Sequence, residues 1–300
     1  FSRIFAQNDF LMKLQTPVAD QPCKTGISYK DKIMMLGSCF TDNIGKMLSD
    51  YGFDVCVNPF GALYNPVSVL NSIERLACCR EFTEEDCVKI GAGDERICSF
   101  HHHTSFARES VEEFLSEANE ALQKASEHFL ASNRIIITLG TSWCFRHTSK
   151  DFIVSNCLKH PAAEFRRERM SVQEVAEALR RITGLSIPGM KPKEFIFTVS
   201  PIRHFKDGAH GNQISKSTLL LGIEDVLEDC RADYFPAYEI VNDELRDYRF
   251  YAEDMCHPSD QTIRYIFERF VSWALPASEH QTLEQNIKAY LRRQHRQQHI

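Results

Sequence analysis

Short runs of continuous apolar residues alternate along the chain with longer segments in which apolar residues recur every three or four positions. Each short run predicts a β-strand that is buried on both faces. The predicted strands are residues 33–36 and 195–199 and the β-branched segment 134–139, and 53–57 is a further strand candidate. The amphipathic segments predict helices, over residues 39–50, 66–78, 110–129, 171–182, 212–227, 260–273 and 283–293. Strands separated by helices are typical of a parallel sheet that is covered on both sides.

We therefore predict an α/β fold, with three α/β/α layers around a mostly parallel sheet. One domain is expected over residues 1–300, with its core at about residues 10–275 and a peripheral C-terminal helix at 279–297. Ligands of such sheets bind beyond the carboxyl ends of the strands. The segments most relevant to function are therefore those that follow the strands, at residues 37–38, 58–61, 140–142 and 200–204.

The composition of the 300 residues is ordinary for a globular protein, with 43% hydrophobic and 25% charged residues. The 13 glycines and 11 prolines are too few for a collagen-like or low-complexity chain. The net charge of −6 provides no overall basic field, so we expect no nucleic-acid partner. No apolar run approaches the roughly 18 residues of a membrane-spanning helix, so we expect no membrane association.

Eleven cysteines are scattered along the chain without the CxxC spacing of a zinc site. Their number is odd, and several lie in apolar runs, where a free cysteine behaves as a small hydrophobic residue. Residues 1–10 lack the long apolar core of a secretory signal peptide. These features predict reduced thiols and a cytoplasmic protein.

Two segments that follow strands carry candidate catalytic groups. Ser38 directly follows the first strand and opens a helix, whose N-terminus stabilises a developing anion. The alternative is that Ser38 only caps the helix, which is the ordinary role of serine at this position. Gly61, after the second strand, could offer an unhindered N–H group to an oxyanion, or it could belong to a plain turn. The segment 140–142 is open to the same two interpretations.

Asp254 and His257 stand three residues apart near the C-terminus. This spacing places both side chains on one face of a helical turn or a tight loop. A carboxylate there can hold the imidazole in the tautomer that a general base requires. A solvated aspartate beside a structurally bound histidine is the alternative.

In combination, these segments follow the order of the conserved blocks in the SGNH (GDSL-like) hydrolases. More closely, the chain resembles the GSCFA family of that superfamily over roughly residues 10–275. The segments that carry this resemblance are LGSCFTDNIGKML at 36–48, VNPFGALYNP at 57–66, SFHHHTSF at 99–106, TLGTSW at 138–143, TVSPIRHFKDG at 198–208, GNQISKS at 211–217, YFPAYEI at 234–240 and DELRDYRFYAEDMCHPSD at 243–260.

The resemblance implies a flavodoxin-like sheet and a serine hydrolase site. By position, Ser38 looks like the nucleophile, His257 like the general base and Asp254 like the residue that orients His257. The backbone amides of Ser38 and Gly61 would form part of the oxyanion hole.

Two departures from the superfamily pattern concern the oxyanion hole and the first block. The superfamily usually places an Asn two residues after the third-block glycine, whereas Gly140 is followed by Thr141 and Ser142. Asn65 is our first candidate to replace this donor, and Ser142 is the second. The first block also lacks the Asp of the usual GDS triplet.

Two further groups of polar residues are candidates for parts of a site. His101, His102 and His103 are consecutive, so they cannot all face one ion without a special turn, and we expect no metal site. Because their segment matches the family, we expect His102 or His103 to line the substrate cleft. Arg203 and His204 follow a strand and are candidates to hold an anionic substrate group, with structural ion pairs as the alternative.

Cys39 adjoins Ser38 and is a possible nucleophile in its place. Side chains of adjacent residues diverge, so only one of the two can face the base, and the block order favours Ser38. The chain contains no GxGxxG, no GxxxxGK[ST] and no GxSxG, which argues against dinucleotide, P-loop and α/β-hydrolase sites. We expect no cofactor.

The sequence thus predicts a serine esterase or acyl-ester hydrolase that acts on a small-molecule or carbohydrate ester. An O-acetylated carbohydrate is the favoured substrate, by analogy with the superfamily alone. Two alternatives remain: an O-acyltransferase with the same triad, and a non-catalytic ligand-binding module on the same fold. The oligomeric state is left open.

Overall fold

Five parallel strands form the central sheet in the order β10-β9-β5-β1-β2. Counted along the chain, this order is 2-1-3-4-5, which is the flavodoxin-like arrangement. The computed structural model describes residues 15–19, 21–228 and 230–297, so the predicted start of the core near residue 10 lies outside it. The strands are β1 (Lys32–Gly37), β2 (Asp54–Val57), β5 (Arg134–Leu139), β9 (Glu194–Val199) and β10 (Ala232–Tyr234).

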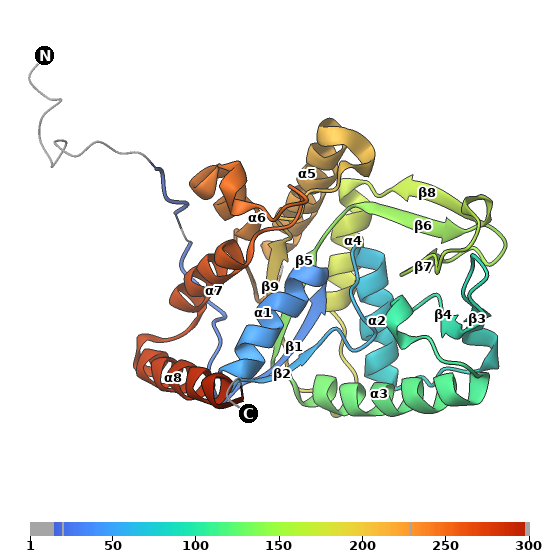
Figure 1. The fold of residues 1–300 in the computed structure, drawn as a ribbon, viewed down its shortest axis with the longest axis horizontal. Helices are drawn as coiled ribbons and strands as arrows, with labels where there is room; N and C mark the ends of the chain where they lie inside the picture. The colour runs from blue at the N-terminus through green and yellow to red at the C-terminus, as the bar shows by residue number, and fades with distance from the viewer. Residues whose placement is uncertain (1–14, 20, 229, 298–300) are drawn as a thin grey trace, which may run out of the picture.

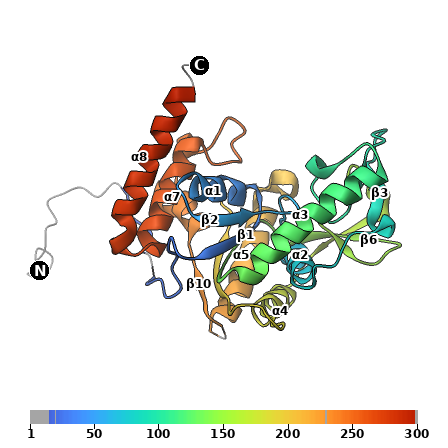
Figure 2. The ribbon, with the colours of Figure 1, turned by 90° about the horizontal axis from the view of Figure 1, so that it is seen from below.

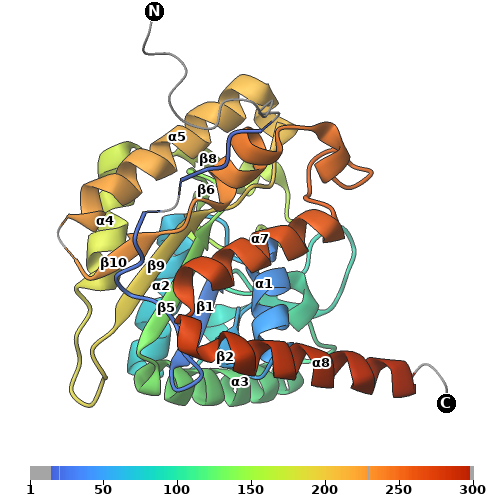
Figure 3. The same ribbon diagram turned by 90° about the vertical axis from the view of Figure 1, so that its left-hand side faces the viewer.

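Helices cover both faces of this sheet, which confirms the prediction of three α/β/α layers (Figure 1). Met34 and Leu36 point to one face, which is covered by α2 (Pro66–Cys78), α3 (Val111–Ala131), α4 (Val172–Thr183) and α5 (Gly208–Leu227). Ile33 and Met35 point to the other face, where α1 (Cys39–Asp50) and α7 (Asp260–Ala274) pack. Figure 3 shows α7 and α8 (His280–Gln297) in front of the strands. Because β1, β5 and β9 are buried on both sides, their residues are apolar over nearly their whole length rather than in alternation, whereas the edge strand β2 is only partly buried.

The helix boundaries follow the expected caps. Asn65 caps α2, and its side chain accepts a hydrogen bond from the Ser68 N–H group while Pro66 occupies the first helical position. Ser171 and Glu174 form the predicted capping box at the start of α4. Most predicted helices and strands lie within two or three residues of those observed; α5 begins four residues before the predicted segment.

Two small antiparallel sheets were not predicted. One pairs β3 (Cys87–Lys89) with β4 (Ile97–Ser99). The other has the order β7-β6-β8 and consists of β6 (Trp143–His147), β7 (Ile153–Val154) and β8 (Phe165–Arg169). Figure 2 shows β3 and β6 at the end of the molecule that lies away from α8. Since β6 starts four residues after β5 ends, the three-stranded sheet extends from the carboxyl edge of the central sheet, where the ligand site of such a fold lies.

The C-terminal helix α8, which was predicted to be peripheral, packs against the end of α1. The Asn286 amide donates a hydrogen bond of 3.0 Å to the carbonyl oxygen of Tyr51, and the Tyr290 ring meets the Tyr51 ring edge-on. None of the helices within residues 15–19, 21–228 and 230–297 combines the length and the hydropathy needed to cross a bilayer. None of the eleven cysteines, all of which lie in the described residues, forms a disulfide.

Candidate functional site

A cavity of about 620 Å³ lies beyond the carboxyl ends of β5 and β9. This volume is in the range of roughly 300–1,000 Å³ that is usual for small-molecule sites. It gathers residues that are far apart in the sequence, from Cys39 at the start of α1 to His257 in the loop before α7. The predicted site residues that line it are Asn65, Arg203, His204, Asp254 and His257.

Asp254 and His257 form the predicted carboxylate–imidazole pair. The Oδ2 atom of Asp254 lies 2.5 Å from Nδ1 of His257, and its Oδ1 atom accepts hydrogen bonds of 2.9 Å from the N–H groups of Cys256 and His257. These backbone N–H groups and the imidazole lower the pKa of Asp254 to about 2. The carboxylate is therefore ionised at neutral pH and fixes which ring nitrogen of His257 faces it. The His257 side chain is 51% exposed, and Nε2 is left available for a proton.

A tight loop rather than a helical turn holds this pair. Met255 has a left-handed φ of 57°, and the Ala252 N–H group donates to the carbonyl oxygen of His257. Arg203 fixes the loop from outside: its N–H group donates to Cys256 O at 3.1 Å, and its guanidinium donates to Met255 O at 3.2 Å. Arg203 thus combines a position in the cavity wall with hydrogen bonds that hold this loop. The structural ion pair given as its alternative role is not formed among the described residues, and a role in holding an anionic substrate group stays a prediction.

Ser38 occupies the N-cap position of α1, but its side chain does not cap the helix. The Oγ atom is fully buried and has no hydrogen-bond partner among the described residues. A buried hydroxyl without a partner is rare and is unfavourable by about 1–3 kcal/mol. The ordinary explanation for a serine before a helix therefore does not account for Ser38. The neighbouring Cys39, and not Ser38, contributes to the lining of the cavity.

The expected oxyanion amides are corrected by the structure. The Ser38 N–H group donates to Thr138 O at 3.2 Å, because Gly37 pairs with Thr138 at the end of β1, and the Gly61 N–H group donates to Asn58 O at 2.8 Å. Both donors are already used. A Cβ atom on Gly61 would lie 2.3 Å from Cβ of His103, so close packing explains this glycine.

Two other amides of α1 are better placed as anion donors. The first N–H groups of a helix have no partner within it. Those of Cys39 and Phe40 lie close enough to the Cys39 sulfur to act against the rise in its pKa. Cys39 lines the cavity, so the N–H groups that open α1 lie next to it and are candidates for the donors of an oxyanion hole.

The two candidate replacements for the missing asparagine differ in position. Asn65 lines the cavity; its oxygen caps α2, and its Nδ2 group donates to Ser68 Oγ at 3.0 Å, which leaves one N–H free for a ligand. Ser142 is fully buried beside Ser215 and does not line the cavity. Gly140 does not line it either, and its place is taken by Thr141.

The expectation that His102 or His103 lines the cleft is also corrected. His102 is fully buried among the rings of Phe60, Phe82, Phe106 and Phe114, and its Nδ1 atom lies 2.7 Å from Ser99 Oγ. Aromatic packing and one hydroxyl thus account for most of its environment.

His103 contacts its own segment and the loop 58–65. Its Nδ1 atom accepts a hydrogen bond from the Ser105 N–H group, and its own N–H group donates to Phe60 O at 2.9 Å. Segment 99–106 therefore packs against the loop 58–65, through the contacts of His102 and His103 with Phe60. Among the described residues, no three His, Cys, Asp or Glu side chains are grouped as metal ligands.

Lys216 on α5 is a site residue that sequence analysis missed. Its fully buried ammonium donates to Gly140 O at 2.6 Å and to Ser200 O at 2.7 Å, and so it joins the segments that follow β5 and β9. Burial lowers the pKa of Lys216 to about 7. Burial also lowers the pKa of the adjacent His204 to about 4, with smaller contributions from Lys216 and His257, so His204 is neutral at pH 7. Nothing in the helical pattern distinguishes Lys216 from a surface lysine.

The small sheet β7-β6-β8 supplies a further wall of the cavity. The Arg167 guanidinium lies 4.1 Å from the centroid of the Trp143 ring and 2.5 Å from the Asp207 carboxylate. This ion pair lowers the pKa of Asp207. The wall was missed because its strands are short and follow no apolar alternation.

The buried histidines predict loss of stability in acid. The folded-state pKa is lowered by burial to about 4 for His101 and His204 and to about 3 for His102, against about 6.5 in an unfolded chain. Between these values the unfolded chain binds more protons, so the free energy of unfolding falls as the pH drops below about 6.5. Each histidine contributes at most about 1.4 kcal/mol per pH unit in that window.

Urea unfolding at several pH values between 7 and 4.5 measures this effect. We expect His102→Asn, which keeps a polar atom near the position of Nδ1, to show a shallower pH dependence than the wild type. An unchanged slope in this variant would contradict the assignment of His102 as a buried neutral imidazole.

Comparison with known families agrees with the fold and the arrangement of these segments. The model of the GSCFA family matches residues 32–270, a range that includes every residue of the cavity described above. No match to the chain is found among curated proteins or among solved structures. Since the match extends over most of its length, the chain belongs to the GSCFA family.

Proposed function

We propose that this protein is a serine esterase in which Ser38, His257 and Asp254 act as nucleophile, general base and orienting carboxylate. The observation that carries the proposal is the partnerless Ser38 hydroxyl at the N-terminus of α1, beside a cavity that contains the Asp254–His257 pair. Buried polar groups without partners require an explanation, and a reacting group is one of the few available. The ordered carboxylate–imidazole pair supports the same chemistry.

The proposed reaction has two steps. Ser38 Oγ attacks the ester carbonyl carbon, and its proton passes to Nε2 of His257 while Asp254 stabilises the imidazolium. The tetrahedral intermediate collapses, and the alcohol leaves with the proton from His257. Water then attacks the acyl-serine with His257 as base, which releases the carboxylic acid and restores Ser38.

The oxyanion of this intermediate needs donors that the structure leaves unpaired. The remaining Nδ2 hydrogen of Asn65 meets this condition. The N–H groups of Cys39 and Phe40 open α1 and so have no partner within the helix, which makes them the other candidate donors. Attack also requires Ser38 Oγ to turn toward the cavity and toward His257. Catalytic hydrogen bonds are often long in unliganded enzymes and shorten when substrate binds.

An O-acetylated carbohydrate is the substrate class that we propose, and a cavity of about 620 Å³ accommodates an acyl group with part of an alcohol. Transfer of the acyl group to a second hydroxyl, in place of water, would use the same intermediate. No cofactor enters either reaction. We also propose a cytoplasmic location, which the eleven cysteines without disulfide bonds favour.

Cys39 is the alternative nucleophile, since it lines the cavity while Ser38 Oγ does not. However, burial and the nearby Asp42 raise the pKa of the Cys39 thiol. A reactive cysteine requires the opposite shift, because the thiolate is the nucleophile. Ser38 is therefore the better assignment for the nucleophile.

A test of the Asp254 role uses aryl acetate hydrolysis. We expect Asp254→Asn to lower kcat/KM by about 10²–10⁴-fold, because the amide no longer fixes the imidazole tautomer or stabilises its cationic form. The thermal midpoint should change little, since both side chains of the pair are about half exposed.

Asp243→Asn is the matched control. Asp243 is an exposed carboxylate that lies 3.9 Å from the Arg246 guanidinium and does not line the cavity. This variant should retain the wild-type kcat/KM. Equal rates in the two variants would contradict a catalytic role of the Asp254–His257 pair.

A further inference from the structure

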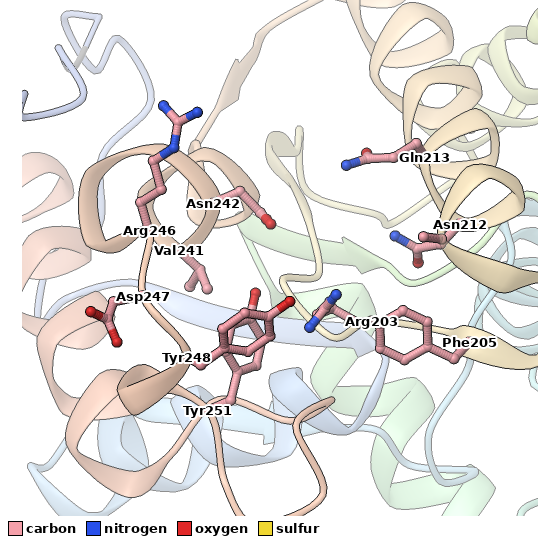
Figure 4. A pocket seen from close by; sticks show the side chains of 11 residues that line it. Arg203, Phe205, Asn212, Gln213, Val241, Asn242, Arg246, Asp247, Tyr248 and Tyr251 are labelled. Atoms are coloured by element: carbon pink, nitrogen blue, oxygen red, sulfur yellow. The ribbon is translucent and has the colours of Figure 1, made fainter.

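A second cavity, of about 230 Å³, shares a wall with the proposed active site. Arg203 and Phe205 line both cavities, so the two spaces are neighbours. Figure 4 shows Arg203 between the rings of Tyr248 and Tyr251 on one side and that of Phe205 on the other. A ligand group placed here would lie next to the proposed site of ester cleavage.

The aromatic part of this cavity is unusually open to solvent. Tyr248 is 64% exposed and Phe205 is 40% exposed. The central carbon of the Arg203 guanidinium lies 4.2 Å from the centroid of the Phe205 ring, 5.3 Å from that of Tyr251 and 5.5 Å from that of Tyr248. These rings fix the guanidinium by cation–π contacts and leave ring surface available for an apolar face of a ligand.

The polar part consists of three amide side chains that are each only partly used. Asn212 Oδ1 accepts from the His204 N–H group, Gln213 Oε1 accepts from the Tyr238 hydroxyl, and Asn242 Nδ2 donates to Tyr238 O. Two amide N–H₂ groups and one amide oxygen are therefore left for a ligand. Figure 4 shows Gln213 and Asn242 on opposite sides of the cavity. Donors and an acceptor together suit hydroxyl groups, which both donate and accept.

The charge of the cavity favours an anionic ligand. Arg203 has no carboxylate within 4.0 Å among the described residues, and its guanidinium donates only to Met255 O. The other charged groups are compensated, since Arg246 lies 3.9 Å from Asp243 and Asp247 lies 3.5 Å from Arg249. A fixed, unpaired guanidinium is the preferred protein partner of a carboxylate or phosphate.

We propose that the second cavity binds one sugar ring that carries a carboxylate or a phosphate, as the alcohol part of the ester. The ring would stack on Tyr248, its hydroxyl groups would bind the amides, and its anionic group would pair with Arg203. The assignment of this ligand as the alcohol part rests on the proposed esterase function. The cavity is smaller than the roughly 300–1,000 Å³ of sites for drug-sized ligands, which fits a single ring.

Saturation-transfer NMR with D-glucuronate, D-glucose 6-phosphate and D-glucose at millimolar concentration tests this proposal. We expect transfer to at least one of the two anionic sugars, with the stronger signal identifying carboxylate or phosphate as the anionic group, and weaker transfer to glucose. Tyr248→Ala should lose the signal. Leu221→Ala, which removes a side chain of similar exposure on α5 that lines neither cavity, should keep it.

Three results would overturn the proposal: no transfer to any of the three sugars, equal transfer to glucose and both anions, or an unchanged signal in Tyr248→Ala. Failure of the esterase proposal is distinguishable, because labelling of Ser38 by a fluorophosphonate does not use the second cavity. If the protein is labelled but binds no sugar, the esterase proposal stands and the sugar-binding proposal is overturned. If the protein binds glucuronate through Tyr248 but is not labelled, the sugar-binding cavity stands and the esterase proposal is contradicted.

Discussion

Replacing Ser38 by alanine is expected to abolish ester hydrolysis while leaving the protein at least as stable as the wild type. The loss in kcat/KM should reach at least about 10³-fold, the scale seen when a nucleophile of a triad is removed. The free energy of unfolding should be unchanged or slightly higher, because the Ser38 Oγ atom forms no hydrogen bond that the substitution could remove. Steady-state kinetics and urea unfolding on the same preparations measure both effects.

Ser126→Ala is the matched control for this substitution. Ser126 is another buried serine, but its Oγ atom donates to Leu76 O at the far side of the sheet. This variant should lose roughly 1 kcal/mol of stability and no activity. His257→Ala should match the loss of Ser38→Ala, and the double variant should be no slower than either single one, because the members of a triad act as a unit. Additive losses would argue against a shared role.

Replacing Lys216 by methionine is the second substitution with a large expected effect. It removes the donor of Gly140 O and Ser200 O, and each buried acceptor left without a partner is unfavourable by about 1–3 kcal/mol. Lys216 is a positioning residue, since it holds the two segments that follow β5 and β9 but is not among the groups assigned to contact substrate. Displacement of these segments by about 1 Å should lower kcat by about 10²-fold.

Lys193→Met separates positioning from stability. Lys193 also donates to two carbonyl oxygens, those of Phe129 and Ser132, but it does so before the amino end of β9, at the edge of the sheet opposite the cavity. The Lys193→Met substitution should therefore lower the midpoint of thermal unfolding and leave kcat unchanged. If the two lysine variants lose activity in proportion to their loss of stability, Lys216 has only a structural role.

Much of the fold could be predicted because the three inner strands of its sheet, β1, β5 and β9, are buried on both faces. Residues 134–139 contain three consecutive isoleucines and a leucine, and the structure places β5 there with the same bounds. The segments that follow the strands could be identified by the same reasoning, since parallel strands end at one edge of the sheet. The Asp254–His257 pair could be predicted from its spacing, because a local contact needs no knowledge of the remaining chain.

The residues that were missed or misplaced depend on long-range packing. Lys216 lies on a helix whose pattern does not reveal that one lysine faces inward, and only the carbonyl oxygens of two distant segments explain it. His102 was assigned to the cleft because its segment matches the family, whereas the structure encloses it in aromatic rings. The second cavity depends on the meeting of three segments around Arg203, which no local pattern encodes.

The central claim is that Ser38 is an activated nucleophile, and covalent labelling with a fluorophosphonate tests it most directly. Intact mass after incubation at pH about 8 would be compared for the wild type, Ser38→Ala and Cys39→Ala. The proposed function predicts a single adduct on the wild type and on Cys39→Ala, and none on Ser38→Ala. An adduct that persists in Ser38→Ala, or a folded wild-type protein that takes no label and hydrolyses no ester, would contradict it.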